Sequence, residues 1–308
     1  MVTRTKAYLA IDCADGIGEG PTWDVEGSRL LWSDNGTGLL HEAKTDGTGG
    51  WRETRRWYLW RTMGDAIKRS AGGIVLVAGA DILTMDDLGN VSPFARLDVR
   101  EDLVKGNEAK CDPSGRLWVG TNAIDFSPGL GGLYRVDPDG RVTTMLENIG
   151  ISNGLDWSPG GDTLYYIDSM TRAVDAFDFD NTRGQIRSRR RVIRFAEDDG
   201  APDGMTVDSE GCLWVTAFGL GEVRRYTPGG ALLQCVEISS PAVTSCAFGG
   251  SDCRDLFITS AAVELPKLFA KYGVSDDVIA NSHQAPGAGG VFACRPGVAG
   301  RWPTPFAG

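Results

Sequence analysis

The chain has 308 residues, of which 42% are hydrophobic and 23% are charged, and its formal net charge is −10. This length and apolar content are sufficient for a large buried core. The acidic balance argues against a nucleic-acid partner, which needs a basic face. No apolar run is long enough to span a bilayer, and residues 1–13 do not read as a signal peptide. We therefore expect a cytoplasmic protein, a monomer or weak homo-oligomer without membrane or nucleic-acid partners.

The seven cysteines are an odd number and form no Cys-x-x-Cys pair. Most of them lie beside apolar residues at strand-like positions. This usage predicts reduced, buried thiols rather than a disulfide framework.

A short apolar strand that follows a turn with Gly or Asp recurs six times along the chain. The copies are VEGSRLLWSD (25–34), SAGGIVLVAG (70–79), DPSGRLWVGT (112–121), SPGGDTLYYID (158–168), DSEGCLWVTA (208–217) and GGSDCRDLFITS (249–260). A second, shorter strand follows most of the copies. Strands that repeat every 40 to 50 residues with Gly-rich hairpins are typical of β-propellers.

The repeats therefore predict an all-β fold, a six-bladed β-propeller with a central channel that forms a single domain over residues 1–308. Each blade needs its neighbours to cover its faces, which is why one domain is expected. The alternative, a pair of β-sandwiches, would not require one motif to recur in register.

Two regions depart from the repeat. Residues 51–69, rich in Arg and Trp, are expected to form an outer strand and the crossover to the next blade, with Arg stems covering aromatic surface. Residues 263–288 form an insertion in the last blade, with a helical turn expected over 266–272. Long loops on the ligand face of a scaffold are often lids. Both alternatives stay open here: a loop that contacts the substrate and one that does not.

Polar residues recur where the innermost strand of each blade should begin. In a propeller these positions meet at one mouth of the channel. In chain order they are Glu19, Asp65, Asn107 with Glu108, Asn153, Asp203, and Thr244 with Ser245. Carboxylates and amides without His or Cys favour a hard cation such as Ca²⁺, Mg²⁺ or Mn²⁺. The spacing therefore predicts a divalent metal site at the channel mouth.

Only two histidines, His41 and His283, are present, and neither falls on a predicted inner strand. This excludes a His-rich zinc site. A surface position is expected for both.

Several motifs resemble the SMP-30/gluconolactonase family, which includes regucalcin and bacterial sugar lactonases. They are GEGPTWD (18–24), NEAKCDPSGRLWVGT (107–121), GGLYRVDPDG (131–140), ISNGLDWSPGGDTLYYIDS (151–169), PDGMTVDSEGCLWVTAF (202–218) and PAVTSCAFGGSD (241–252).

The resemblance implies a role for six residues. Glu19, Asn153 and Asp203 would hold the metal, and Lys105, Asn107 and Asp125 would contact the substrate, with Asn107 also open as an additional ligand. Lys105 stands where the family usually has Arg, and Glu108 where it usually has Asp. A lysine keeps the charge but lacks the planar, two-pronged donor of arginine.

The activity that the resemblance implies is hydrolysis of a sugar lactone to its aldonic acid. One divalent cation, Ca²⁺ first and otherwise Mg²⁺, Mn²⁺, Zn²⁺ or Fe²⁺, would polarise the lactone carbonyl. Asp203 is the candidate general base for the attacking water, or else purely a ligand. Two other functions stay open: a metal-dependent phosphotriesterase or arylesterase, and a calcium-binding propeller without enzymatic activity.

Overall fold

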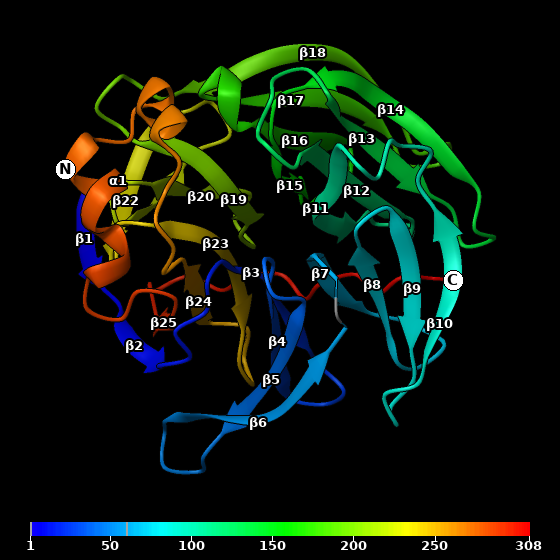
Figure 1. Ribbon diagram of the computed structural model, residues 1–308, viewed down its shortest axis with the longest axis horizontal. Helices are drawn as coiled ribbons and strands as arrows, with labels where there is room; N and C mark the ends of the chain where they lie inside the picture. Colours follow the sequence, from blue (N-terminus) through cyan, green and yellow to red (C-terminus); the bar gives the residue numbers. More distant parts are fainter. Residues whose placement is uncertain (1, 60) are drawn as a thin grey trace.

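The computed structural model describes residues 2–59 and 61–308 and consists almost entirely of β-strands. The strands form six sheets that surround a central channel like the blades of a propeller (Figure 1). This confirms the predicted six-bladed β-propeller. Within the described ranges, no helix is long and apolar enough to cross a membrane.

Each blade has four antiparallel strands, and consecutive inner strands contact one another around the channel. The inner strands are β3 (Gly18–Asp24), β7 (Met63–Lys68), β11 (Val104–Cys111), β15 (Ser152–Trp157), β19 (Ala201–Val207) and β23 (Val243–Gly249). The second strands, which carry the sequence repeat, are β4 (Arg29–Asp34), β8 (Ile74–Ala78), β12 (Leu117–Ala123), β16 (Thr163–Asp168), β20 (Leu213–Phe218) and β24 (Asp255–Ser260). The third strands are β5 (Leu39–Thr45), β9 (Asp81–Met85), β13 (Gly131–Val136), β17 (Ala173–Asp180), β21 (Glu222–Tyr226) and β25 (Val291–Cys294).

The outer strands include one from the far end of the chain. Five of them are β6 (Trp51–Tyr58), β10 (Val91–Arg96), β14 (Val142–Ile149), β18 (Gln185–Arg194) and β22 (Leu232–Glu237), and the sixth is β2 (Tyr8–Ile11). Strand β2 pairs with β25 and so completes the last blade with N-terminal residues. Strand β1 (Thr3–Lys6) adds a parallel fifth strand beside β22. The ring is therefore closed by hydrogen bonds between the two ends of the chain.

A buried tryptophan on the second strand accounts for the repeat in blades three and five. Trp118 Nε1 donates to Asp112 Oδ2 at 3.0 Å, and Trp214 Nε1 donates to Asp208 Oδ2 at 2.9 Å. Both indoles are fully buried. A buried N–H needs a partner, so the turn aspartate and the tryptophan six residues later are required together.

The two regions outside the repeat behave as expected. Strand β6 is the outer strand predicted within 51–69, although Trp60 of that stretch lies outside the described residues. The insertion holds the predicted helical turn as η2 (Lys267–Tyr272), followed by α1 (Asp276–Asn281) and η3 (Ser282–Gln284). A further short turn, η1 (Ser169–Thr171), follows β16. All seven cysteines are unpaired, and six of them are buried, as predicted.

The C-terminal residues cover one mouth of the channel. Phe306 is fully buried, and its N–H donates to Lys68 O at 2.8 Å. The next residue, Ala307, donates to Gly115 O at 2.9 Å. In Figure 1 this red segment crosses the centre of the ring toward the C-terminus. One end of the channel is therefore covered, and the other carries the inner-strand starts.

The expected surface position of His41 is wrong. The ring is fully buried on β5 and stacks on Trp32, with centroids 4.7 Å apart. Its Nε2 lies 3.0 Å from Asp15 Oδ1, and its Nδ1 lies 2.5 Å from Glu53 Oε1. Two carboxylates from other segments offset the cost of burying this ring. The sequence of strand β5 alone does not show that they lie there. His283 lies partly exposed in the insertion.

The ion pairs of His41 predict a pH-dependent contribution to stability. Burial alone would lower the pKa of His41, but the contacts with Asp15 and Glu53 outweigh burial, and the pKa is raised. The stabilisation is then complete below about pH 6.5 and is lost as pH rises through the folded-state pKa. We expect His41→Gln to cost about 3 kcal/mol of unfolding free energy at pH 6 and less at pH 9. Urea unfolding at both pH values measures this.

His283→Gln is the matched control and should leave that pH dependence as it is in the native protein. A stability difference between the native protein and His41→Gln that does not change from pH 6 to pH 9 would contradict the ion-pair account.

Candidate functional site

All six inner strands break their regular pairing at the same place, close to the uncovered channel mouth. In β15 the register shifts between Ser152 and Leu155, and in β19 it shifts between Pro202 and Met205. Equivalent shifts occur in the other four inner strands. The residues within the shifts are Gly20-Pro21, Gly64-Asp65, Asn107-Glu108, Asn153-Gly154, Asp203-Gly204 and Thr244-Ser245. Bulges of this kind re-aim side chains next to functional sites.

The glycines after Asn153 and Asp203 are required by the neighbouring blades. A Cβ atom on Gly154 would lie 2.8 Å from the backbone oxygen of Asp203, and one on Gly204 would lie 2.6 Å from the Cα of Ser245. Only glycine allows the backbones to approach this closely. The Asn-Gly and Asp-Gly pairs thus bring a polar side chain and a tight contact to the same point.

Five of the six predicted site residues line one cavity of about 230 Å³. They are Glu19, Lys105, Asn107, Asn153 and Asp203. Asn107, Asn153 and Asp203 occupy equivalent bulge positions, whereas Glu19 pairs with Ser33 just before its bulge. Glu19 therefore reaches the cavity from one residue earlier in the register.

Asp125 is the predicted residue that the structure does not bring to this cavity. It is exposed, and its carboxylate accepts hydrogen bonds from Ser127 N at 2.9 Å and from Ser127 Oγ at 2.8 Å. The adjacent Phe126 lines the cavity instead. The carboxylate of Asp125 thus forms the turn that carries Phe126.

A chain of hydrogen bonds runs across the cavity floor and links four blades. It starts with Lys105 Nζ, which donates to Asn35 Oδ1. The later bonds are Asn35 Nδ2 to Asn107 Oδ1 at 3.3 Å, Asn107 Nδ2 to Asn153 Oδ1 at 2.7 Å, Asn153 Nδ2 to Ser169 Oγ at 2.7 Å and Ser169 Oγ to Pro202 O at 2.6 Å. Because Asn35, Asn107, Asn153 and Ser169 each donate and accept within it, the chain fixes the orientation of the Asn153 amide beside Asp203.

The carboxylates at the floor disfavour one another's charged forms. Burial raises the pKa of Glu19 well above its usual range, and the charges of Asp203, Glu108 and Asp65 raise it further. Burial also raises the pKa of Asp203, although the Asn153 side chain opposes this. Among the described residues, the one cationic side chain in the cavity wall is Lys105, whose pKa burial lowers to about 8. A cluster of this kind either takes up protons or is stabilised in its charged form by a bound cation.

The donor set fits a hard divalent cation. Within residues 2–59 and 61–308, no group of three or more His, Cys, Asp or Glu side chains is gathered as metal ligands. The candidate set instead combines the carboxylates of Glu19 and Asp203 with the amide oxygen of Asn153, all of them hard oxygen donors. The buried Glu108 Oε2 near them also lacks a hydrogen-bond partner.

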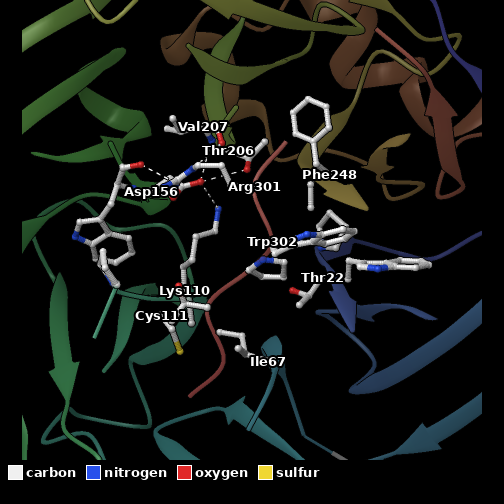
Figure 2. A pocket seen from close by; sticks show the side chains of 18 residues that line it. Thr22, Ile67, Lys110, Cys111, Asp156, Thr206, Val207, Phe248, Arg301 and Trp302 are labelled. Atoms are coloured by element: carbon white, nitrogen blue, oxygen red, sulfur yellow. Dashed lines mark hydrogen bonds and ion pairs between the residues drawn. The ribbon is translucent and has the colours of Figure 1, made fainter. Parts of the chain in front are cut away.

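A smaller hollow, of about 80 Å³, lies at the opposite, covered mouth (Figure 2). Its carboxylate, Asp156, bonds to Arg301 at 2.8 Å, to Thr206 Oγ1 at 3.2 Å and to Val207 N at 2.8 Å, with Lys110 Nζ at 3.4 Å. Burial would raise the pKa of Asp156, but Lys110 and Arg301 lower it below its usual value. This carboxylate already has cationic partners and anchors the C-terminal segment, so the other cavity is the candidate functional site.

Residues that the sequence analysis missed complete the cavity. Asn35 and Ser169, both in the hydrogen-bond chain, directly follow Asp34 and Asp168. These aspartates cap equivalent turns, with Asp34 accepting from Ile17 N and Asp168 accepting from Ile151 N. An aspartate followed by a polar residue at the end of the repeat is the signal that could have found them.

Comparisons with known proteins agree with the motif resemblance. The model of the SMP-30/Gluconolactonase/LRE-like region matches residues 17–262. Regucalcin of Danio rerio is 34% identical over 85% of this chain and 88% of its own length. A protein of Bacillus subtilis (strain 168), provisionally named a sugar lactone lactonase, is 33% identical over 98% of this chain and 99% of its own length.

A solved structure supports the same assignment. The structure described as a calcium-binding protein, regucalcin, from Agrobacterium tumefaciens superposes with a TM-score of 0.87. It is 27% identical, and the match covers 99% of each chain. The chain therefore belongs to the SMP-30/gluconolactonase/LRE-like family.

Proposed function

We propose that this protein is a metal-dependent hydrolase that opens a lactone, with sugar lactones as the first class to test. One observation carries the proposal: Glu19, Asn153 and Asp203 converge on the floor of one cavity, and Lys105 is the one cation among the described residues that line it. The family description and the name of the Bacillus subtilis relative support a lactone substrate. The description of the Agrobacterium structure supports Ca²⁺.

In this proposal Glu19, Asn153 and Asp203 hold the cation. When bound, the cation supplies Lewis acidity to the lactone carbonyl and stabilises the negative charge that develops on its oxygen. The site lies on inner strands packed on both faces, so its ligands are held rigidly.

The side chains of the floor perform the remaining steps. Asp203 accepts a proton from the water that attacks the carbonyl carbon, and the ring C–O bond then breaks. The departing ring oxygen takes up a proton, and the product is a hydroxy acid. Lys105 and Asn107 orient the lactone because both face the cavity beside Asp203.

Removing a carboxylate from the floor should abolish the effect of calcium on activity and on stability. We expect Asp203→Asn and Glu19→Gln each to lower kcat for lactone hydrolysis about 100-fold or more. Both should also lose the calcium-dependent rise in melting temperature, which in the native protein corresponds to about 2.7 kcal/mol at 100 times Kd. Without metal, each variant should melt above the native protein, because one of several mutually repelling carboxylates is gone. Calorimetry with and without Ca²⁺ and a lactone assay measure these effects.

Asp156→Asn is a matched control, since Asp156 is a buried inner-strand carboxylate with its own cationic partners. It should lower stability yet keep the calcium-dependent rise. The proposal fails if that rise persists in both floor variants.

Lys105 should act on the substrate rather than on the metal. We expect Lys105→Met to raise KM about tenfold, because the substrate loses a charged hydrogen bond. The calcium-dependent rise in melting temperature should remain. Steady-state kinetics together with melting curves at fixed calcium separate the two effects, and a lost calcium response would place Lys105 among the groups that maintain the metal site.

A further inference from the structure

The upper part of the candidate cavity is built differently from its floor. Its residues come from the insertion and from loops and strand ends of blades one, three, four, five and six, and they are almost all apolar. They are Ile17, Phe126, Ile151, Ala201, Phe218, Ala261, Val263, Leu265, Pro266 and Phe269. Among the cavity residues of the insertion only Glu264 is charged, and its side chain is exposed.

Phe269 joins two sides of the cavity. Its ring centroid lies 5.5 Å from that of Phe126, on the loop after β12, and 5.5 Å from that of Phe218, at the end of β20. Phe269 also packs against a buried cluster that includes Ala201, Phe218 and Leu265. The insertion, orange in Figure 1 beside blade five, is thus attached to the cavity wall by apolar contacts.

The backbone at Phe126 is held in an unusual conformation. Its φ is +59°, in the left-handed region that bulky side chains rarely adopt. The hydrogen bonds of Asp125 with Ser127 form this turn, and they place the aromatic ring, not the carboxylate, at the cavity. Strain of this kind is typical of functional sites.

The polar atoms of the floor are partly engaged with one another. Lys105, Asn35, Asn107 and Asn153 bond in sequence, and the groups left for a ligand, chiefly the carboxylates of Glu19 and Asp203, all lie at the floor. The buried Asn122 Oδ1 is one acceptor without a partner. A ligand with several hydroxyl groups would therefore leave some of them without hydrogen bonds against apolar side chains, which is costly.

We propose that the substrate is a lactone that carries an apolar alkyl or aryl substituent, which packs against Phe126, Phe218 and Phe269 while the lactone carbonyl faces Asp203. This inference rests on the proposed lactone hydrolysis. It narrows the substrate class, because polyhydroxylated sugar lactones are then expected to be poorer substrates than lactones with an apolar substituent.

Three δ-lactones with the same ring test the proposal on the calcium-loaded full chain. They are δ-valerolactone without a substituent, δ-nonalactone with a butyl group and the hydroxyl-rich δ-gluconolactone. We expect kcat/KM for δ-nonalactone to exceed that for each of the other two about tenfold or more. Acid release at constant pH measures all three.

Two substitutions assign the preference to the aromatic rings. Phe126→Gly removes one ring and suits the positive φ, so the fold is preserved. Phe269→Ser removes a second of the three rings. Each should lower the ratio of kcat/KM for δ-nonalactone to that for δ-valerolactone about tenfold. Leu88→Ser, at a side chain that is 87% exposed on blade two, is the control and should leave the ratio as it is.

A preference for δ-gluconolactone, or a ratio that neither substitution changes, would overturn the inference. If no lactone is hydrolysed, the proposed function fails, and binding of the corresponding δ-lactams decides this inference separately. Tighter calorimetric binding of the butyl lactam than of the hydroxylated lactam, lost in Phe126→Gly, supports the apolar site. Equal or weaker binding of the butyl lactam overturns it.

Discussion

Closing six blades into a ring forces side chains from different blades into one small volume at each end of the channel. Carboxylates there cannot avoid one another, and their charge must be offset. At the covered mouth Lys110 and Arg301 neutralise Asp156, and the C-terminal segment is anchored as a result. At the other mouth Glu19 and Asp203 form no ion pair within the described residues, and Lys105 is the one cationic side chain in the cavity wall. The same constraint thus yields a structural anchor at one end and, in the proposed function, a cation site at the other.

The repeats could be recognised in the sequence because they depend on contacts within one short segment. An aspartate in a turn and a tryptophan six residues later must occur together when the indole is buried, as with Asp112 and Trp118. Asn153 and Asp203 were identified for a related reason, since the glycine after each is required by the next blade. Features that one segment can specify alone could therefore be predicted.

Some features that depend on two distant segments, and that the repeat does not encode, could not be predicted. The four-residue strand β2 closes the ring only because β25, nearly the whole chain away, offers it an edge. From the sequence alone His41 is expected at the surface, because nothing in it shows that Asp15 and Glu53 lie beside the two ring nitrogens. Near the cavity, the sequence could not show that the turn of Asp125 presents Phe126.

The polar floor of the cavity and its apolar upper part, here called the roof, thus belong to different parts of the fold. The floor lies on the inner strands, where a bulge in every blade repeats the same geometry. Two of the roof's aromatic rings, Phe126 and Phe269, come from a loop turn and from the insertion, neither of which the ring needs in order to close. Because the floor would hold the cation, the type of reaction is tied to the blades themselves. The choice of substrate can change through Phe126 and Phe269 without disturbing that chemistry, since neither ring contributes to the hydrogen-bond chain of the floor.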